Sequence, residues 1–325
     1  MLRVVPLRKT HRYSNFLRIS GIFVYPVFAI CYGPRMRVSL PFLLSVFCLF
    51  FGSSCVRTST VVRVKKDGTG SIVSRYFFSP QMLAMIDQLG GIAGAPGGGE
   101  GVPNLGMIRE MATPDEESLR KDAVNFGEGV RYSKHDPGKD EDGWEGYSVV
   151  YEFDDIRKVR IDQNSVPGKA KEFVESSGEE LKADKGGALS FTLDGDLLTV
   201  KTSFASAGMN GLIDGKQFAQ AREMGMAPSE AVKMAAGMAE GMRVGLFLRA
   251  DGGIAETSAE HVTGDLIILS DADIAKVLPD PDFGAFIDKA AEHPEGVTAQ
   301  SVKALFKTIE AMTIEGADQI TVKLK

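Results

Sequence analysis

The reactive side chains of this sequence are unevenly distributed along it. All three cysteines, Cys31, Cys48 and Cys55, lie within the first 55 of its 325 residues. No residue after Cys55 can therefore form an internal disulfide or a thiolate metal site. The sequence also has no HExxH motif, no Gly-x-Ser-x-Gly motif and no P-loop. We therefore predict a protein that is not an enzyme and that holds no cofactor and no metal.

Other polar side chains that could do chemistry are scattered. His135, His261 and His293 each lie in a polar, turn-like context, and we expect isolated surface residues. The acidic cluster at 136–142 lacks the ligand spacing of an EF-hand loop, which favours a solvated turn. The glycine-rich segment 90–106 contains no basic residue, so it is predicted to be a loop and not a phosphate cradle.

Methionines form the most suggestive pattern of the later sequence. Met234, Met238 and Met242 recur every four residues, with Met224 and Met226 just before them, on a sequence of helical character. Ordinary core packing explains such a stripe. The sharper alternative is an adaptable apolar groove for a lipid or a partner helix, because thioether side chains repack at low cost.

An apolar segment leads up to Cys55. Residues 38–51 contain no charge, Met36-Arg37 comes directly before them, and the small residues 52–54 follow. Fourteen residues in a helix cover roughly 21 Å, less than the ~30 Å hydrocarbon core of a bilayer. The segment is therefore predicted to be a cleaved export signal and not a membrane span.

This segment resembles the signals of bacterial lipoproteins, in which an aliphatic residue and two small residues precede a cysteine. Gly52-Ser53-Ser54-Cys55 supplies the small residues and the thiol, but Gly52 stands where that class has Leu, Val or Ile. The resemblance implies a lipid on Cys55 and cleavage just before it. The departure at Gly52 leaves a conventional secreted protein, cleaved near Ser54 without a lipid, as the alternative. Because Val56 and not Asp follows the cysteine, the resemblance also implies the outer membrane, facing the periplasm.

The predicted organisation follows from this signal. Residues 36–54 are the lipoprotein signal peptide and residues 55–325 the mature envelope domain, with a possible division near 162–187, where the chain is polar and charged. Since Met36 begins a complete signal by itself, we predict that residues 1–35 are an extension upstream of the true start. The alternative is that the apolar stretch 19–31 forms a hairpin with the second apolar run.

The charge distribution agrees with an exported domain. The formal net charge is −6, yet residues 1–66 contain eleven basic residues and no acidic one. From Asp67 onward, 26 basic residues face 43 acidic ones, a net charge of −17. Such an acidic body would repel phosphates, so we predict no nucleic-acid partner. The expected partners are the bilayer, through the acylated cysteine, and a lipid or an envelope protein.

The mature sequence predicts an α+β fold of antiparallel β-hairpins packed with several helices. Asp-Gly pairs at 67–68, 194–195 and 251–252 each join two apolar runs, which is typical of hairpin turns. The expected strands are 60–66, 71–78, 147–153, 189–193, 197–204, 244–248, 254–259, 266–269 and 320–324. Four helices are expected. One follows the predicted N-cap Ser79, and a second runs from a capping box at Thr113 to about Phe126. The others cover 274–278, after a capping box formed by Ser270 and Asp273, and 298–312.

A broader resemblance covers residues 36–78, from the signal through the first predicted hairpin. In this layout the chain is similar to uncharacterised bacterial lipoproteins, among them the mycobacterial lipid-binding type. The resemblance implies a membrane-tethered protein with a binding or scaffolding role and brings no site residues with it. A cell-wall hydrolase that uses scattered carboxylates, and a purely structural envelope component, are the alternatives.

Overall fold

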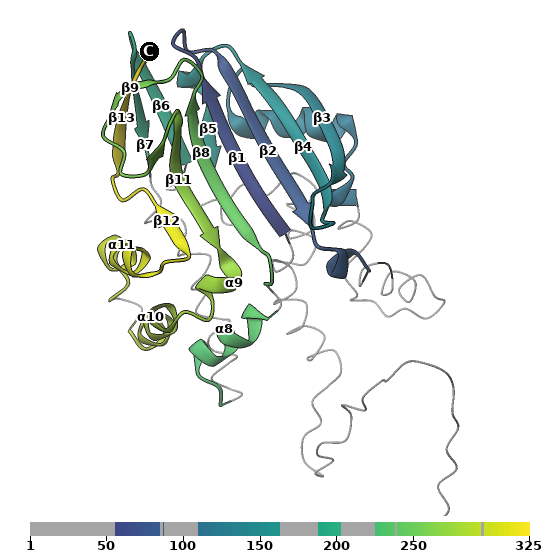
Figure 1. Ribbon diagram of the computed structural model, residues 1–325, viewed down its shortest axis with the longest axis vertical. Helices are drawn as coiled ribbons and strands as arrows, with labels where there is room; N and C mark the ends of the chain where they lie inside the picture. Colours follow the sequence, from purple (N-terminus) through teal and green to yellow (C-terminus); the bar gives the residue numbers. More distant parts are fainter. Residues whose placement is uncertain are drawn as a thin grey trace, which may run out of the picture. The chain divides into compact units, whose positions relative to one another are not determined.

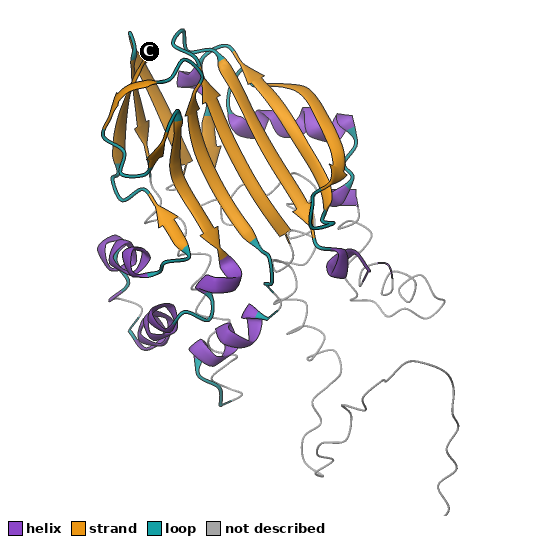
Figure 2. Cartoon of the chain, viewed as in Figure 1, coloured by secondary structure: helices purple, strands orange, loops and turns teal. Residues whose placement is uncertain are grey.

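The computed structural model describes most of the chain that follows Cys55. The chain divides into two compact units, Met1–Ser45 and Val46–Lys325, and the described residues all lie in the second. They are residues 56–84, 87, 110–162, 188–202, 225–237, 239–293 and 296–325. No helix among them is both long enough and apolar enough to cross a bilayer. Two β-sheets and several helices give this unit an α+β fold, as predicted (Figure 2).

The larger sheet has eight strands, and the first strand of the fold lies in its interior (Figure 1). The strand order is β10-β11-β8-β1-β2-β4-β3, and β12 also pairs with β11. Among the described strands of this sheet, β1 and β8 run parallel and the other pairs are antiparallel. The strands are β1 (Val56–Val64), β2 (Gly70–Phe78), β3 (Arg131–Lys139), β4 (Glu145–Phe153), β8 (Arg243–Ala250), β10 (Val262–Thr263), β11 (Leu266–Asp273) and β12 (Met312–Ile314).

The smaller sheet has five antiparallel strands in the order β5-β6-β7-β13-β9. Its last strand in sequence, β13, lies between two strands that precede it. The strands are β5 (Arg160–Asp162), β6 (Ala188–Asp194), β7 (Leu197–Lys201), β9 (Ile254–Thr257) and β13 (Gln319–Leu324). The predicted division near 162–187 falls almost wholly outside the described residues, and the two sheets use chain from both sides of it.

Two of the predicted hairpins are confirmed. β1 pairs with β2 around Asp67-Gly68, where Gly68 has a φ of 84°. The Asp67 carboxylate accepts hydrogen bonds from the backbone N–H and the hydroxyl of Thr69, at 2.9 and 2.8 Å, and these bonds lower the pKa of Asp67. β6 pairs with β7 around the equivalent Asp-Gly turn. Asp-Gly is a good hairpin signal because Gly adopts positive φ without steric cost.

The third predicted hairpin, over 244–259, is wrong. β8 pairs with β1 and β11 in the larger sheet, whereas β9 pairs with β13 in the smaller one. The turn at Asp251 therefore carries the chain from one sheet to the other. The Asp251 N–H donates to the Val64 carbonyl at 2.9 Å, and its carboxylate binds Arg63, so β1 holds the turn. Turn residues predict a change of direction but do not determine which strands pair.

A strand that the sequence did not predict, β3, occupies one edge of the larger sheet. It contains His135, which was expected in a turn-like context, and Asp136 and Pro137, which belong to the segment predicted to be an acidic turn. Proline has no N–H to donate, and it is tolerated here because β3 pairs with β4 alone. The turn itself is shorter and lies at 140–144, where the Asp140 carboxylate accepts the N–H of Trp144 at 2.8 Å.

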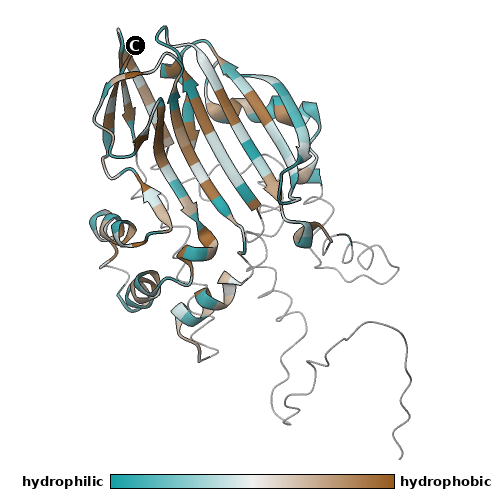
Figure 3. Cartoon of the chain, viewed as in Figure 1, coloured by the Kyte–Doolittle hydropathy of each residue, from teal (hydrophilic) through white to brown (hydrophobic). Residues whose placement is uncertain are grey.

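The hydrophobic core lies between the two sheets. The alternation predicted over 147–153 is confirmed: Tyr147, Val149, Tyr151 and Phe153 of β4 are each at most 2% exposed. The same buried cluster contains side chains of the smaller sheet, and residues of α4 (Glu116–Asp122) and of the 3-10 helix η1 (Ala123–Phe126). Figure 3 shows the alternating hydrophilic and hydrophobic bands along the strands of the larger sheet.

The helix ends correct several predicted caps. Ser79 accepts the N–H of Met82 at 3.2 Å, as a predicted N-cap should. The next helix is capped by Asp115, whose carboxylate accepts the N–H of Ser118, and not by Thr113. Asp273, at the start of α9 (Ile274–Val277), makes no capping hydrogen bond to a described residue and instead pairs with Lys276 at 2.8 Å.

A second cluster of buried side chains forms among the C-terminal helices. α8 (Pro228–Ala236), α10 (Pro281–Glu292) and α11 (Ala299–Thr308) pack around Phe283 and Ile287, which are at most 2% exposed. Helix α10 was not predicted. Helix α11 begins after Thr298, as expected, but ends at Thr308, so that Met312 begins β12 and does not extend the helix.

Three neighbouring tyrosines with raised pKa values should make the domain less stable at high pH. The rings of Tyr76 and Tyr147 are 5.3 Å apart, and burial raises the pKa of Tyr76 from 10.0 to about 12. Burial also raises the pKa values of Tyr147 and Tyr151. Between about pH 10 and pH 12 the unfolded chain releases a Tyr76 proton that the folded chain keeps. The free energy of unfolding should therefore fall as pH rises through this window.

Urea unfolding between pH 8 and pH 12 measures this effect. The Tyr76→Phe variant should show a shallower decline than the wild-type chain, because one of the raised pKa values has been removed. An identical decline in the two proteins would show that Tyr76 does not contribute.

Candidate functional site

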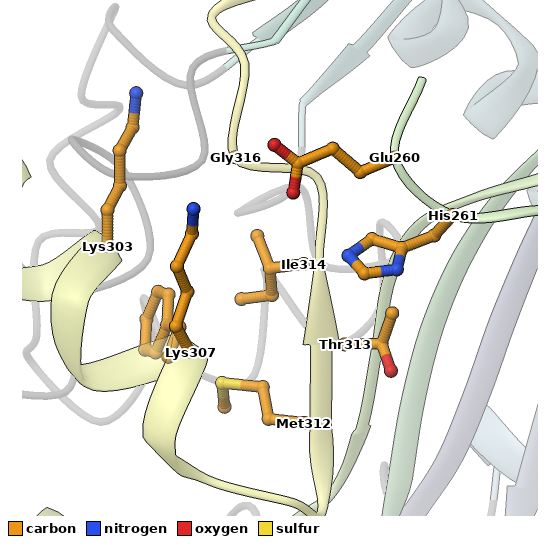
Figure 4. Close-up of a pocket in the computed structure, with 9 residues that line it drawn as sticks. Glu260, His261, Lys303, Lys307, Met312, Thr313, Ile314 and Gly316 are labelled. Carbon is orange, nitrogen blue, oxygen red and sulfur yellow. The ribbon is translucent and has the colours of Figure 1, made fainter.

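A pocket lies where α11 and β12 meet the loop that joins β9 to β10. Its volume is about 240 Å³, below the roughly 300–1,000 Å³ of pockets that hold drug-sized ligands. Side chains of the helix, the strand and the loop surround this space (Figure 4). The lining residues are Glu260, His261, Lys303, Phe306, Lys307, Met312, Thr313, Ile314 and Gly316.

Regular structure positions two sides of the pocket. β12 pairs with β11, which places Ile314 opposite Ser270 and Met312 opposite Ala272. Lys303 and Lys307 are four residues apart in α11, so both project from one face of the helix. The helix start is fixed by Thr298 and Ser301, each of which accepts the backbone N–H of the other in a capping box.

A buried carboxylate joins the two irregular sides. Glu315 is 2% exposed. It accepts the N–H of Glu260 at 2.9 Å and the N–H of Ala317 at 3.2 Å. Its own N–H donates to the carbonyl of Leu269 in β11, at 2.9 Å. Glu315 therefore fixes the loop that carries Glu260 to the segment that follows β12.

The two pocket lysines have different surroundings. The Lys303 ammonium lies 2.6 Å from the carboxylate of Asp318. None of the described residues pairs with the Lys307 ammonium. A methyl group at Gly316 would lie 3.7 Å from Cε of Lys307 and 3.8 Å from both carboxylate oxygens of Glu260. Lys307 and Glu260 therefore flank the same small space without forming an ion pair.

The pocket combines charge at its rim with an apolar interior. Phe306, Met312 and Ile314 supply apolar surface, while Lys307 supplies a cation and Glu260 an anion. Figure 4 shows the Lys307 and Glu260 side chains approaching from opposite walls, with His261 beside Glu260. This arrangement suits a small molecule that carries an anionic group and a hydrocarbon part, with a hydrogen-bond donor facing Glu260.

The structure separates the residues that the sequence singled out. Cys55 and Met238 lie outside the described residues, so the lipid anchor and the complete methionine stripe stay predictions. Met234, in α8, is 67% exposed, and Met242 is half-buried just before β8. Neither Met234 nor Met242 is among the described residues that line the pocket, to which Met312 contributes.

The three later histidines lie in different parts of the fold. His135 is in β3, with Nδ1 2.8 Å from the Tyr132 hydroxyl oxygen, and His293 follows α10. His261 lines the pocket and is the one of the three with a place in the candidate site. Among the described residues, no three His, Cys, Asp or Glu side chains gather with the spacing of a metal site.

Sequence reasoning missed this pocket because its walls are far apart in the chain. Phe306 and Met312 were assigned to one apolar helix face, which hid the break at Thr308 between α11 and β12. A usable signal was the Glu260-His261 pair, placed in a loop between two strand runs. Its partners on the opposite wall come from pairing between β11 and β12, which no local pattern reveals.

Comparisons with known proteins add one structural likeness. No protein-family model and no curated protein sequence matches the chain. The NMR structure of the folded domain of LppM from Mycobacterium tuberculosis is similar to this chain, with a TM-score of 0.25 and 9% sequence identity. The match covers 66% of this chain and 81% of that domain. A likeness of this size does not define a shared fold, so the function is argued from the residues of the chain itself.

Proposed function

We propose that this protein is an envelope lipoprotein, tethered through Cys55, whose folded domain binds a small amphiphilic anion. The ammonium of Lys307, which pairs with none of the described residues and lies beside the apolar surface of Phe306, Met312 and Ile314, is the observation that carries the binding role. An unpaired charge at the edge of an apolar pocket is stabilised by a ligand of opposite charge. The tether is supported by the small residues before Cys55 and by the acid-free, basic segment upstream.

Binding is favoured over hydrolysis by the composition of the lining. Glycoside hydrolysis by paired carboxylates requires two acidic groups roughly 5 to 10 Å apart, on either side of the scissile bond. Among the described lining residues, Glu260 is the sole carboxylate. Glu315 lies beneath it, and its oxygens accept two backbone N–H groups. We therefore propose a binding protein and not an enzyme.

Octanoate is a suitable probe because it joins a carboxylate to a short hydrocarbon chain. We expect calorimetric titration to detect binding of octanoate. Octanol should bind more weakly, because it carries no negative charge to pair with the Lys307 ammonium. Lys307→Met keeps the apolar stem and removes the ammonium, so it should weaken octanoate binding about tenfold, as expected for the loss of one charged hydrogen bond.

Two matched variants make this test specific. Lys289→Met removes an exposed lysine of α10, outside the pocket, and should leave octanoate binding unchanged. Glu260→Gln removes the carboxylate that faces the ligand and should strengthen octanoate binding. Equal affinity for octanoate and octanol, or equal losses in the two lysine variants, would contradict the proposal.

The tether is tested separately in cells. Mass spectrometry of the protein isolated from bacterial membranes should show an N-terminal Cys55 that carries acyl chains. Cys55→Ser should release the protein from the membrane fraction. An unmodified N-terminus at or near residue 55 would instead establish the conventional secreted form. The outer membrane, facing the periplasm, is the location we propose, and separation of the two membranes tests it.

A further inference from the structure

The first strand of the fold leaves no linker between the proposed tether and the domain. β1 begins at Val56, the residue next to Cys55, and Val56 is already paired with Phe78 of β2. From Thr58 onward β1 also pairs with β8 on its other side. The Cα atom of Cys55 lies one peptide bond, about 3.8 Å, from that of Val56. A lipid on Cys55 would therefore be attached almost directly to an interior strand.

The start of β1 is held by several contacts in addition to strand pairing. The Arg57 guanidinium donates to Asp140 at 2.9 Å, to Asp142 at 2.7 Å and to the carbonyl of Gly241 at 2.8 Å. The same guanidinium lies 4.1 Å from the ring centroid of Trp144, in a cation–π contact. These contacts connect Arg57, the second residue of β1, to the β3–β4 turn and to the segment before β8, so that the start of β1 cannot easily detach from the sheet and act as a linker.

Several elements share this end of the larger sheet. Because β8 is parallel to β1, it also begins there, and α8 comes just before it in the chain. The Ile274 N–H at the start of α9 donates to the Met242 carbonyl at 3.0 Å, an ordinary length for a backbone hydrogen bond. In Figure 1, α8 and α9 lie beside the start of β8. The β1–β2 turn lies at the opposite end of the same sheet.

Exposed apolar side chains occur on these elements. Met234 of α8 is 67% exposed and Val244 of β8 is 39% exposed. Val244 lies beside Thr58 in the register of β1 and β8, two residues beyond Val56. The interfacial region of each leaflet is roughly 5 to 7 Å deep. A lipid anchored one residue before β1 must therefore bring this end of the sheet to the depth of the headgroups.

We propose that the domain stands on the bilayer with the start of β1 facing it, and that Met234 and Val244 contact lipid. This orientation rests on the proposed tether at Cys55. It places the 194–197 turn away from the membrane, because Lys66 of the β1–β2 turn pairs with Asp196 at 3.7 Å. The bilayer is thus the partner of a defined surface of the fold, and the acyl chains are not its sole contact.

The chain contains natural reporters for a direct test. Trp144 is the one tryptophan of the sequence, and Cys55 is the one cysteine from residue 55 onward. The described sheets and core are formed wholly by residues from Val56 onward, so residues 55–325 contain the complete described fold. This chain can be coupled through Cys55 to a maleimide phospholipid in phosphatidylcholine vesicles that also contain a nitroxide-labelled lipid. Chemical coupling makes the result independent of acylation in cells.

Tryptophan fluorescence then measures which end meets the lipid. We expect the nitroxide lipid to quench Trp144 at least twofold, and to quench a tryptophan introduced by Met234→Trp in a Trp144→Phe background. Leu197→Trp in the same background is the matched control, because Leu197 is 42% exposed and lies at the opposite end. The Leu197→Trp protein coupled to vesicles should be as fluorescent as the same protein without coupling, because the nitroxide lipid does not reach it.

A linker variant tests the role of the missing spacer. Ten Gly and Ser residues inserted between Cys55 and Val56 span roughly 17 Å on average, enough to lift the domain clear of the headgroups. Trp144 quenching should then fall to the level of the Leu197→Trp control. Equal quenching at positions 144 and 197, or quenching that the linker leaves unchanged, would overturn the orientation. If Cys55 is acylated in cells but Trp144 is not quenched in the vesicles, the orientation is refuted and the tether stands. If Trp144 is quenched but Cys55 is unmodified in cells, the tether is refuted and the orientation of the coupled protein stands.

Discussion

Replacing Gly146 with alanine should destabilise the domain by about 3 kcal/mol, the upper part of the usual range for overpacking a core. Gly146 lies in β4, next to β2. A methyl group there would lie within hard-contact distance of the Tyr76 carbonyl oxygen and 2.8 Å from the Cα atom of Phe77. Both are backbone atoms of β2, so no side-chain rotation can relieve the overlap. The two strands would have to separate at the start of β4.

The opposite glycine supplies a matched control. Gly138 of β3 is the register partner of Gly146, and a methyl group at Gly138 would meet no atom within 4 Å. Urea unfolding followed by circular dichroism should therefore show little change for Gly138→Ala and a large loss of the free energy of unfolding for Gly146→Ala. Similar values for the two variants would mean that β2 and β4 do not approach as closely as described.

The second large effect is expected at Glu315. Glu315→Ala leaves the N–H groups of Glu260 and Ala317, both in partly buried hydrogen bonds, without their acceptor. Hydrogen bonds to a charged group contribute about 1.5 to 3 kcal/mol each, so the loss should be about 3 kcal/mol or more. Urea unfolding followed by circular dichroism measures this loss.

Two other variants separate this mechanism from a general charge effect. Glu310→Ala removes an exposed carboxylate just after α11 and should change the free energy of unfolding by no more than about 0.5 kcal/mol. Glu315→Gln keeps one acceptor oxygen and should recover part of the lost stability. If Glu315→Ala is as stable as Glu310→Ala, the buried carboxylate does not hold the loop.

Local sequence patterns predicted the parts of the fold that depend on neighbouring residues. Alternation over 147–153 gave the buried face of β4, and Asp67-Gly68 gave the β1–β2 hairpin. The partners of β8 could not be predicted in this way. β1 is more than 180 residues away in sequence, and the pairing is decided by the core that both sheets share.

The candidate site shows the same division. The helix that carries Lys307 was predicted, whereas the capping role of Thr298 was not. That Lys307 would face Glu260 depends on β12, a three-residue strand whose place is set by β11. The importance of Glu315 was also hidden, because a glutamate after a short apolar run resembles any surface residue. The fold can bury its carboxylate because two backbone N–H groups donate hydrogen bonds to it.

The position of β1 also has a consequence for the order of folding. Every chain is synthesised from its N-terminus, so β1 and β2 are made close together, but β8 follows only at residues 243–250. Until then one side of β1 is an open edge, and such edges invite pairing with other chains. The smaller sheet waits longer still, because β13 lies between β7 and β9. Neither sheet can therefore be completed before residues 312–324 are present, and the end of the sequence decides when the strand edges close.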